Sequence, residues 1–168
     1  MDLIPIVSVV GKSNVGKTTL LEKILRELKA RNYKVATVKH DVHGFSIDIP
    51  GKDTWRHAQA GADVVIISSP QKVAMITKVE RELDLDQVCA RVSGVDIIIT
   101  EGYKRSNKPK IEVFRKGVYA ELLCSPEELI AIASDVEFSL GVPCYGLNDA
   151  SGLVDRLEEL YLGTAKGK

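Results

Sequence analysis

Apolar runs typical of buried strands alternate along the chain with segments whose apolar residues recur at helical spacing. The run from Ile4 to Val10 is almost entirely aliphatic, as expected of a strand covered on both faces. Beyond residue 18 one helical stripe follows, formed by Leu20, Leu21, Ile24, Leu25 and Leu28. Further strands are predicted over residues 35–39, 62–68, 72–79, 95–100, 111–115, 130–133 and 142–145.

More helices are predicted between these strands and near the end of the chain. Asp53 is expected to cap a short helix that runs through Ala60 and stops at Gly61. Another helix is predicted over residues 83–92. Asp149 is expected to cap the last one, whose apolar stripe is Leu153, Val154, Leu157, Leu160 and Tyr161. Such alternation indicates an α/β protein with a parallel sheet.

Residues 11–18 match the phosphate-binding pattern G-x-x-x-x-G-K-[ST] without a mismatch. In such a loop the glycines let successive N–H groups point at phosphate oxygens, and the next helix adds its positive N-terminus. Lys17 is expected to reach the β- and γ-phosphates, and the Thr18 hydroxyl to ligate Mg²⁺. An aliphatic strand precedes the loop and an amphipathic helix follows, so we predict nucleoside triphosphate binding by Gly11, Lys12, Ser13, Asn14, Val15, Gly16, Lys17, Thr18 and Thr19.

The loop and the alternating pattern together predict a three-layer phosphate-loop NTPase fold. It should have a mostly parallel central sheet, helices on both faces and a small antiparallel β extension. We expect one nucleotide-binding domain over residues 1–163 and a flexible tail over residues 164–168. Within the loop, Lys12 either resembles the signature lysine of deviant Walker A proteins, which reaches a dimer partner's nucleotide, or is an exposed loop lysine.

Two acidic residues in the segment 95–102 are candidates for the magnesium side of the site. Ligands of parallel sheets bind at the carboxyl ends of the strands. Glu101 lies at that end of its predicted strand, whereas Asp96 lies at the beginning, about 17 Å away at ~3.3 Å per residue. Glu101 is therefore expected to contact Mg²⁺ directly or through water and to serve catalysis with Lys17, and Asp96 to be structural.

Several residues are candidates for recognising the purine base. The guanine-reading pattern Asn-Lys-x-Asp is absent, since residues 107–110 end in Lys110 where it needs an acid. Asp135, just after a predicted strand, is the best-placed carboxylate to accept from guanine N–H groups. It could equally cap the turn into residues 136–138. Residues 146–149, after the next strand, could close over the base.

Histidines and basic residues cluster after the strands that end near residues 39 and 100. His40, His43 and Asp48 could ligate a metal, but their spacing matches no characteristic zinc site, so hydrogen bonding alone is favoured. Asp48 could instead orient a water molecule. The basic stretch 104–110 is either a solvated loop or part of a second, anionic-ligand site with candidate residues Lys39, His40, His43, Lys52, Arg56, His57, Lys104 and Arg105.

Composition narrows the classes of partner. The 168 residues include 23 basic and 23 acidic side chains, so net charge drives no binding to nucleic acid or to a membrane. No apolar run approaches the roughly 18 residues of a membrane span, and the N-terminal residues do not resemble a secretory signal. Three scattered cysteines, read as free thiols, indicate a reducing compartment, and we expect a cytoplasmic protein.

The chain resembles the molybdopterin-guanine dinucleotide biosynthesis protein B (MobB) family over nearly its whole length. The motifs that carry the resemblance are residues 11–18, 39–48, 51–54, 56–57, 60–62, 96–104 and 130–135. This resemblance implies a homodimer that binds GTP with Mg²⁺ and hydrolyses it slowly. It also implies partnership with the MobA-type molybdenum cofactor guanylyltransferase in attaching GMP to molybdopterin, with molybdopterin itself a potential ligand.

Two other functions share some of these features. A small-molecule phosphate-loop kinase would also have a Glu-Gly pair after a strand, and the basic stretch 104–116 could act as its lid. A GTP-dependent nickel metallochaperone would explain the histidines. The chain lacks the His-rich tail and Cys-His cluster expected of such a protein.

Overall fold

The computed structural model describes residues 3–163, and the predicted tail over 164–168 lies outside the described residues. Two compact units are present. The first comprises the described residues up to His40 and from Leu85 onward, and the second comprises Asp41–Asp84. The expected single domain over residues 1–163 stays a prediction.

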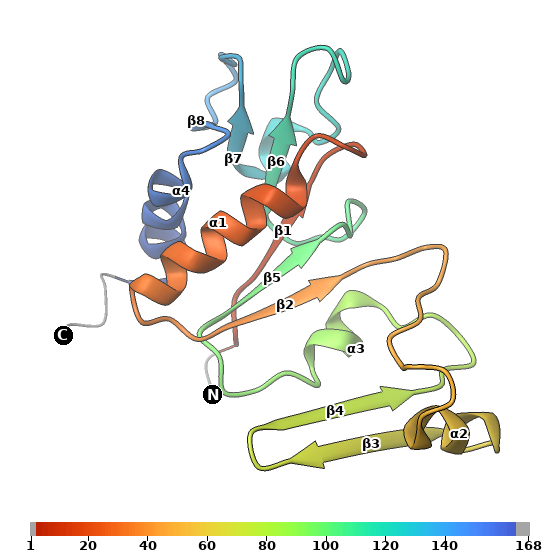
Figure 1. Ribbon diagram of the computed structural model, residues 1–168. Helices are drawn as coiled ribbons and strands as arrows, with labels where there is room; N and C mark the ends of the chain where they lie inside the picture. Colours follow the sequence, from red (N-terminus) through yellow and green to blue (C-terminus); the bar gives the residue numbers. More distant parts are fainter. Residues whose placement is uncertain (1–2, 164–168) are drawn as a thin grey trace. The chain divides into compact units, whose positions relative to one another are not determined.

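The first unit is built on a six-stranded sheet in which every neighbouring pair is parallel (Figure 1). The strand order is β2-β5-β1-β6-β7-β8. The strands are β1 (Ile6–Val10), β2 (Val35–Lys39), β5 (Ile97–Glu101), β6 (Lys110–Phe114), β7 (Leu129–Ser134) and β8 (Cys144–Gly146). The predicted α/β class and parallel sheet are confirmed.

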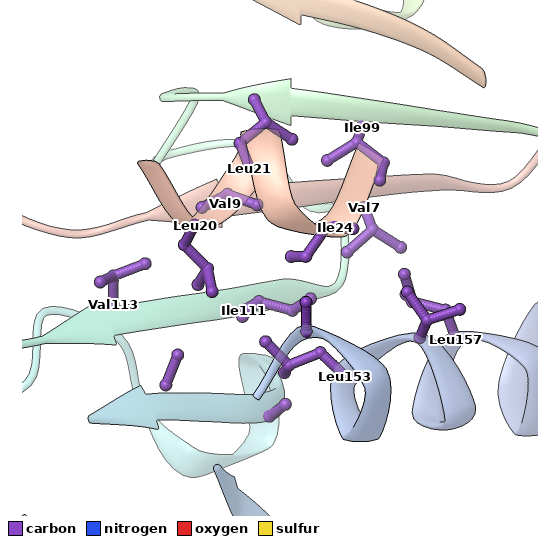
Figure 2. Packing of buried hydrophobic residues seen from close by; sticks show 14 of the residues in the cluster. Val7, Val9, Leu20, Leu21, Ile24, Ile99, Ile111, Val113, Leu153 and Leu157 are labelled. Atoms are coloured by element: carbon purple, nitrogen blue, oxygen red, sulfur yellow. The ribbon is translucent and has the colours of Figure 1, made fainter. Parts of the chain in front are cut away.

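Helices cover both faces of this sheet. α1 (Lys17–Ala30) and α4 (Ala150–Leu157) pack on one face, where their leucines and isoleucines meet alternate residues of the central strands (Figure 2). α3 (Leu85–Cys89) packs against Ile98 on the other face. As predicted, Asp149 caps α4, because its carboxylate accepts from the Gly152 N–H at 2.9 Å. A π-helical turn, η2 (Glu158–Leu162), continues α4, and a 3₁₀ turn, η1 (Pro126–Glu128), precedes β7.

The second unit contains α2 (Asp53–Gln59) and the strands β3 (Val64–Ser69) and β4 (Lys72–Thr77). The strands pair antiparallel from Val64↔Thr77 to Ser69↔Lys72, which confirms the predicted β extension. Alternation places Val64, Ile66, Val73 and Met75 on one face of this hairpin. These four side chains are between 48% and 66% exposed.

Some predicted boundaries were wrong. The helix predicted over 83–92 is confined to Leu85–Cys89, and its first and last residues are the buried ones. Lys52, in extended conformation, is the N-cap of α2, and Asp53 is its first helical residue rather than its cap. Other strand ends shift by one or two residues from the predicted ones.

Buried polar residues shape the sheet's central strands. Glu112 of β6 is fully buried and accepts hydrogen bonds from the Tyr119 hydroxyl and from the N–H groups of Leu123 and Cys124. Three donors on one carboxylate offset the cost of its burial and hold the chain after β6 in place.

Cys89 and Cys124 are buried and Cys144 is exposed, all as free thiols. In residues 3–163 no helix has the length and hydropathy needed to cross a membrane.

Candidate nucleotide-binding site

The loop between β1 and α1 is tightly curled at its two glycines. Gly11 has φ +146°, and a Cβ there would lie 2.6 Å from the Val113 carbonyl oxygen of β6. Gly16 has φ +98° and is the N-cap of α1. Only glycine fits the first position without a clash, and it is strongly favoured at the second. The curl brings the loop's amides to the N-terminus of a 14-residue helix, a geometry suited to phosphate oxygens.

Lys17 lies inside this loop. Its ammonium donates to the carbonyl oxygens of Gly11 at 3.1 Å and Lys12 at 2.7 Å. Burial lowers the pKa of Lys17 from its ordinary value; the negative charge of Glu101 opposes the shift and the nearby Lys39 ammonium adds to it. An ammonium held by two carbonyl oxygens of the loop, at the first residue of α1, is positioned to meet a polyphosphate.

Thr18 and Glu101 meet beside the loop. The Thr18 hydroxyl donates to Glu101 Oε1 at 2.9 Å, because β5 pairs with β1 and places Glu101 opposite Val9. A hydroxyl and a carboxylate are the hard oxygen donors that Mg²⁺ prefers, so these residues fit a magnesium ion. At the start of the same strand, Asp96 accepts from the Lys34 N–H at 2.8 Å. Both carboxylates lie where the sequence placed them, and their roles stay predictions.

Two residues of the predicted anionic-ligand site also lie at this edge. Lys39, the last residue of β2, pairs in register with Glu101. His40 follows it, donates its N–H to the Glu101 carbonyl oxygen at 3.0 Å, and stacks on the Tyr103 ring with centroids 4.6 Å apart. Tyr103 adopts φ +53° directly after Gly102, so the chain turns sharply behind the carboxylate. Lys39 and His40 are thereby brought to the side of the loop where Thr18 meets Glu101.

The basic stretch after Tyr103 is not a uniformly solvated loop. Lys110 is 1% exposed and pairs with Glu128 of η1 at 2.8 Å. Lys108 pairs with Asp86 of α3 at 2.6 Å. Both partners lie far away in the sequence, so charge counting along the stretch could not separate these structural cations from Lys104 and Arg105, which remain candidates for an anionic ligand.

The remaining candidates lie in the second unit and are described within it: His43, Asp48, Lys52, Arg56 and His57. Asp48 Oδ1 accepts from the Ile49 N–H and from the Thr54 hydroxyl, both at 2.9 Å. Its Oδ2 is buried without a hydrogen-bond partner in the protein. No group of three or more His, Cys, Asp or Glu residues that could hold a metal occurs within residues 3–163, so the metal hypothesis for His40, His43 and Asp48 gains no support.

The carboxyl ends of β6, β7 and β8 form the other side of the site. Asp135 accepts from the Lys116 N–H at 2.8 Å. The turn after β7 is instead capped by Ser134, whose hydroxyl accepts from the Val136 N–H at 2.9 Å, so the alternative role predicted for Asp135 was wrong. Beyond β8, the Asn148 side chain accepts from Lys23 of α1. The segment 146–149 is thus tied to the helix that follows the phosphate loop.

Two residues at this side were not singled out from the sequence. The Arg115 Nε donates to the Val15 carbonyl oxygen at 3.5 Å, so its guanidinium braces the phosphate loop. The Tyr119 ring lies under the Lys12 ammonium, 5.0 Å from nitrogen to centroid, and both roles considered for Lys12 stay predictions. The position of Arg115 at the carboxyl end of a predicted strand was the available signal.

Comparisons with known proteins agree on one family. The sequence profile of molybdopterin guanine dinucleotide synthesis protein B (MobB) matches residues 6–135. The molybdopterin-guanine dinucleotide biosynthesis adapter protein of Escherichia coli (strain K12) is 38% identical over 163 residues, which cover 94% of this chain and 93% of that protein. The adapter protein of Haemophilus influenzae (strain ATCC 51907 / DSM 11121 / KW20 / Rd) is 31% identical over 157 residues, with 92% and 88% covered.

Solved structures give the same result. A crystal structure of molybdopterin-guanine biosynthesis protein B (mobB) superposes with a TM-score of 0.72 at 30% identity, covering 92% of this chain and 99% of that one. The crystal structure of Bacillus subtilis MobB superposes with a TM-score of 0.70 at 25% identity, covering 90% and 97%.

Proposed function

The chain belongs to the molybdopterin guanine dinucleotide synthesis protein B family, and from this premise we propose that it is a GTP-binding adapter of molybdenum cofactor biosynthesis. It assists the attachment of GMP to molybdopterin, which forms molybdopterin guanine dinucleotide. The observation that carries the proposal is the Thr18–Glu101 hydrogen bond, 2.9 Å long, beside a phosphate loop whose lysine lies inside it.

In this proposal the loop amides and the N-terminus of α1 bind the phosphate oxygens of GTP. Lys17 exchanges its contacts with the loop carbonyls for the β- and γ-phosphates, because a full negative charge attracts the ammonium more strongly than a carbonyl dipole. Thr18 and Glu101 would hold Mg²⁺, and the ion would supply positive charge to offset that of the phosphates. Asp135 accepts from the guanine base.

We further propose that hydrolysis is slow and serves the adapter role. Asp48 stays the proposed residue for orienting the attacking water; within its own unit, its Oδ1 accepts from the Ile49 N–H and the Thr54 hydroxyl. Lys39, His40, His43, Lys52, Arg56, His57, Lys104 and Arg105 stay the candidates for a second, anionic ligand, for which molybdopterin is the proposed identity.

The proposed partners are a second copy of the chain and a MobA-type guanylyltransferase. The exposed apolar face of the β3–β4 hairpin, made of Val64, Ile66, Val73 and Met75, supports self-association, since isolated soluble domains rarely leave such a patch open. A cytoplasmic location is proposed with it, supported by the free thiols of Cys89, Cys124 and Cys144.

Calorimetric titration of the purified protein with GTP and ATP, each with and without Mg²⁺, tests the proposal. We expect GTP to bind more tightly than ATP and Mg²⁺ to tighten GTP binding. Lys17→Ala should abolish the binding of both GTP and ATP, because the phosphates lose the ammonium that the loop holds. Arg26→Ala, on the exposed side of α1, should bind as the unchanged protein does. Absence of heat with either nucleotide would contradict the proposal.

A further inference from the structure

The sheet order separates two ends of the nucleotide site. β1, which leads into the phosphate loop, has β5 on one side and β6 on the other. Thr18 and Glu101 meet on the β5 side, where Mg²⁺ and the γ-phosphate belong. A triphosphate that lies along the loop therefore directs its nucleoside toward the ends of β6 and β7.

Arg115 stands at this second end. It directly follows the last residue of β6, and Asp135 directly follows the last residue of β7, because Phe114 and Ser134 are the final pair of these two strands. Side chains alternate along a strand, so Arg115 follows Ile111 and Val113 onto the face packed by α1. The Val15 contact agrees with this direction, and Nη2 lies 3.6 Å from the place that a Cβ on Gly16 would take.

The chain around Arg115 is held on both sides. Asp135 accepts from the N–H of the next residue, Lys116, which ties this segment to the end of β7. The Arg115 Nε donates to the Val15 carbonyl oxygen of the phosphate loop, and Arg115 as a residue is exposed. Nε and Nη2 thus lie against the loop at Val15 and Gly16, and the Asp135 carboxylate is held at the backbone of the next residue, Lys116.

We infer that Arg115 is a specificity-determining residue that reads the O6 and N7 edge of guanine. The inference rests on the proposed binding of GTP and adds the residue that selects its base. Guanine presents two acceptors on this edge, O6 and N7, which match the forked donors of a guanidinium. Adenine presents an N6 amino donor in place of O6, and a guanidinium has no acceptor for it.

Asp135 makes the base a better occupant of this end than a phosphate. A carboxylate at the end of the neighbouring strand accepts from guanine N1–H and the 2-amino group, but it repels a phosphate. The two side chains are not an ion pair in the described structure, so the cation and the anion are available to different edges of one ring. Together they would replace the Asn-Lys-x-Asp pattern that the sequence lacks.

The test compares bases as well as variants. The unchanged protein, Arg115→Met and Asp135→Asn are titrated with GTP, 6-thio-GTP and 7-deaza-GTP in the presence of Mg²⁺. The first analogue weakens the O6 acceptor and the second removes N7, and both keep N1–H and the 2-amino group. The unchanged protein should bind each analogue about tenfold more weakly than GTP.

Arg115→Met should weaken GTP binding by about 10- to 100-fold and bring the three nucleotides within about threefold of one another. Asp135→Asn should weaken GTP binding but keep the preference for GTP over the two analogues. Lys116→Met makes the same charge change one residue away and keeps its backbone N–H, so it should preserve both affinity and preference. Circular dichroism verifies that each variant is folded.

Three outcomes overturn the inference. Equal weakening of all nucleotides by Arg115→Met would mean that Arg115 acts on the phosphates or on the loop alone. Equal affinity of the unchanged protein for GTP and both analogues would mean that this edge of guanine is not read, although GTP binding itself would stand. Failure of the unchanged protein to bind any of the three would overturn the proposed function as well.

Discussion

At the scale of single residues, the site is a set of contacts made around one loop. Lys17 donates to the loop's own carbonyls, Thr18 donates to Glu101, and Arg115 donates to Val15. The Lys17 contact lies within the loop, whereas the Thr18 and Arg115 contacts join the loop to the ends of β5 and β6. A substitution at each residue is therefore expected to affect a different part of the bound nucleotide. Glu101 is the residue that we propose to bind Mg²⁺.

Replacing Glu101 with glutamine separates binding from chemistry. The amide is nearly isosteric with the carboxylate and can still accept from Thr18, so the loop should remain formed and GTP affinity should fall by no more than a few fold. The lost charge weakens the hold on Mg²⁺, so Mg²⁺-dependent hydrolysis should fall by about 10²-fold or more. Phosphate release under single-turnover conditions measures this. Unchanged hydrolysis would mean that a different residue holds the metal.

At the scale of elements, α1 is supported at both ends. Its N-terminus follows the phosphate loop, and its C-cap residue Arg31 reaches α4 and η2. The Arg31 guanidinium lies 2.8 Å from Glu27, 2.6 Å from Asp155 and 2.7 Å from Glu158. The Tyr33 hydroxyl donates to Glu158 at 3.0 Å, and burial raises the pKa of Tyr33. The network locks the helix to the C-terminal elements.

Arg31→Met should therefore destabilise the whole unit. It leaves Glu158, whose side chain is only 14% exposed, without its cation, and we expect the free energy of unfolding to fall by about 2–4 kcal/mol. Urea unfolding followed by circular dichroism measures the change. Arg26→Met breaks the exposed pair with Glu22 on the same helix and should cost less than about 0.5 kcal/mol. Equal effects of the two substitutions would contradict a structural role for the network.

At the scale of the whole molecule, the two compact units differ in how they bury apolar residues. The first has its apolar residues inside, between the sheet and its helices. The second leaves Ile66 and Met75, which pair across the hairpin, 59% and 55% exposed. This exposed apolar face is the surface that the proposed self-association would bury.

Ile66→Lys combined with Met75→Lys should shift the protein from dimer to monomer. Two charges placed opposite one another on the hairpin face cannot be buried without a partner, so association should weaken by at least about 100-fold. Sedimentation equilibrium measures the shift. Gln71→Lys adds charge at the hairpin turn, away from that face, and should leave the dimer intact. A dimer that survives the double substitution would exclude this face as the interface.

Much of the fold was predictable because its signals are local. Short stretches of neighbouring residues encode the apolar strand β1, the phosphate loop that follows it and the apolar stripe of α1. The β3–β4 hairpin was equally clear, since a short polar turn joins two β-branched runs. Glu101 and Asp96 could be distinguished because position along a strand determines which end of the sheet a residue occupies.

The sequence by itself determined the chemistry this chain can attempt: a loop for phosphates, a lysine, a hydroxyl and a strand-end carboxylate, together with the α/β class. Only the tertiary structure decided which charges serve that chemistry. In the folded chain Lys110 is buried and paired with Glu128, and Lys108 pairs with Asp86. Ser134 caps the turn after β7, and Arg115 donates to the Val15 carbonyl oxygen. The physical reason is range: propensity and periodicity act between neighbours in the chain, whereas a charge acquires its role from whatever folding brings within a few ångströms of it.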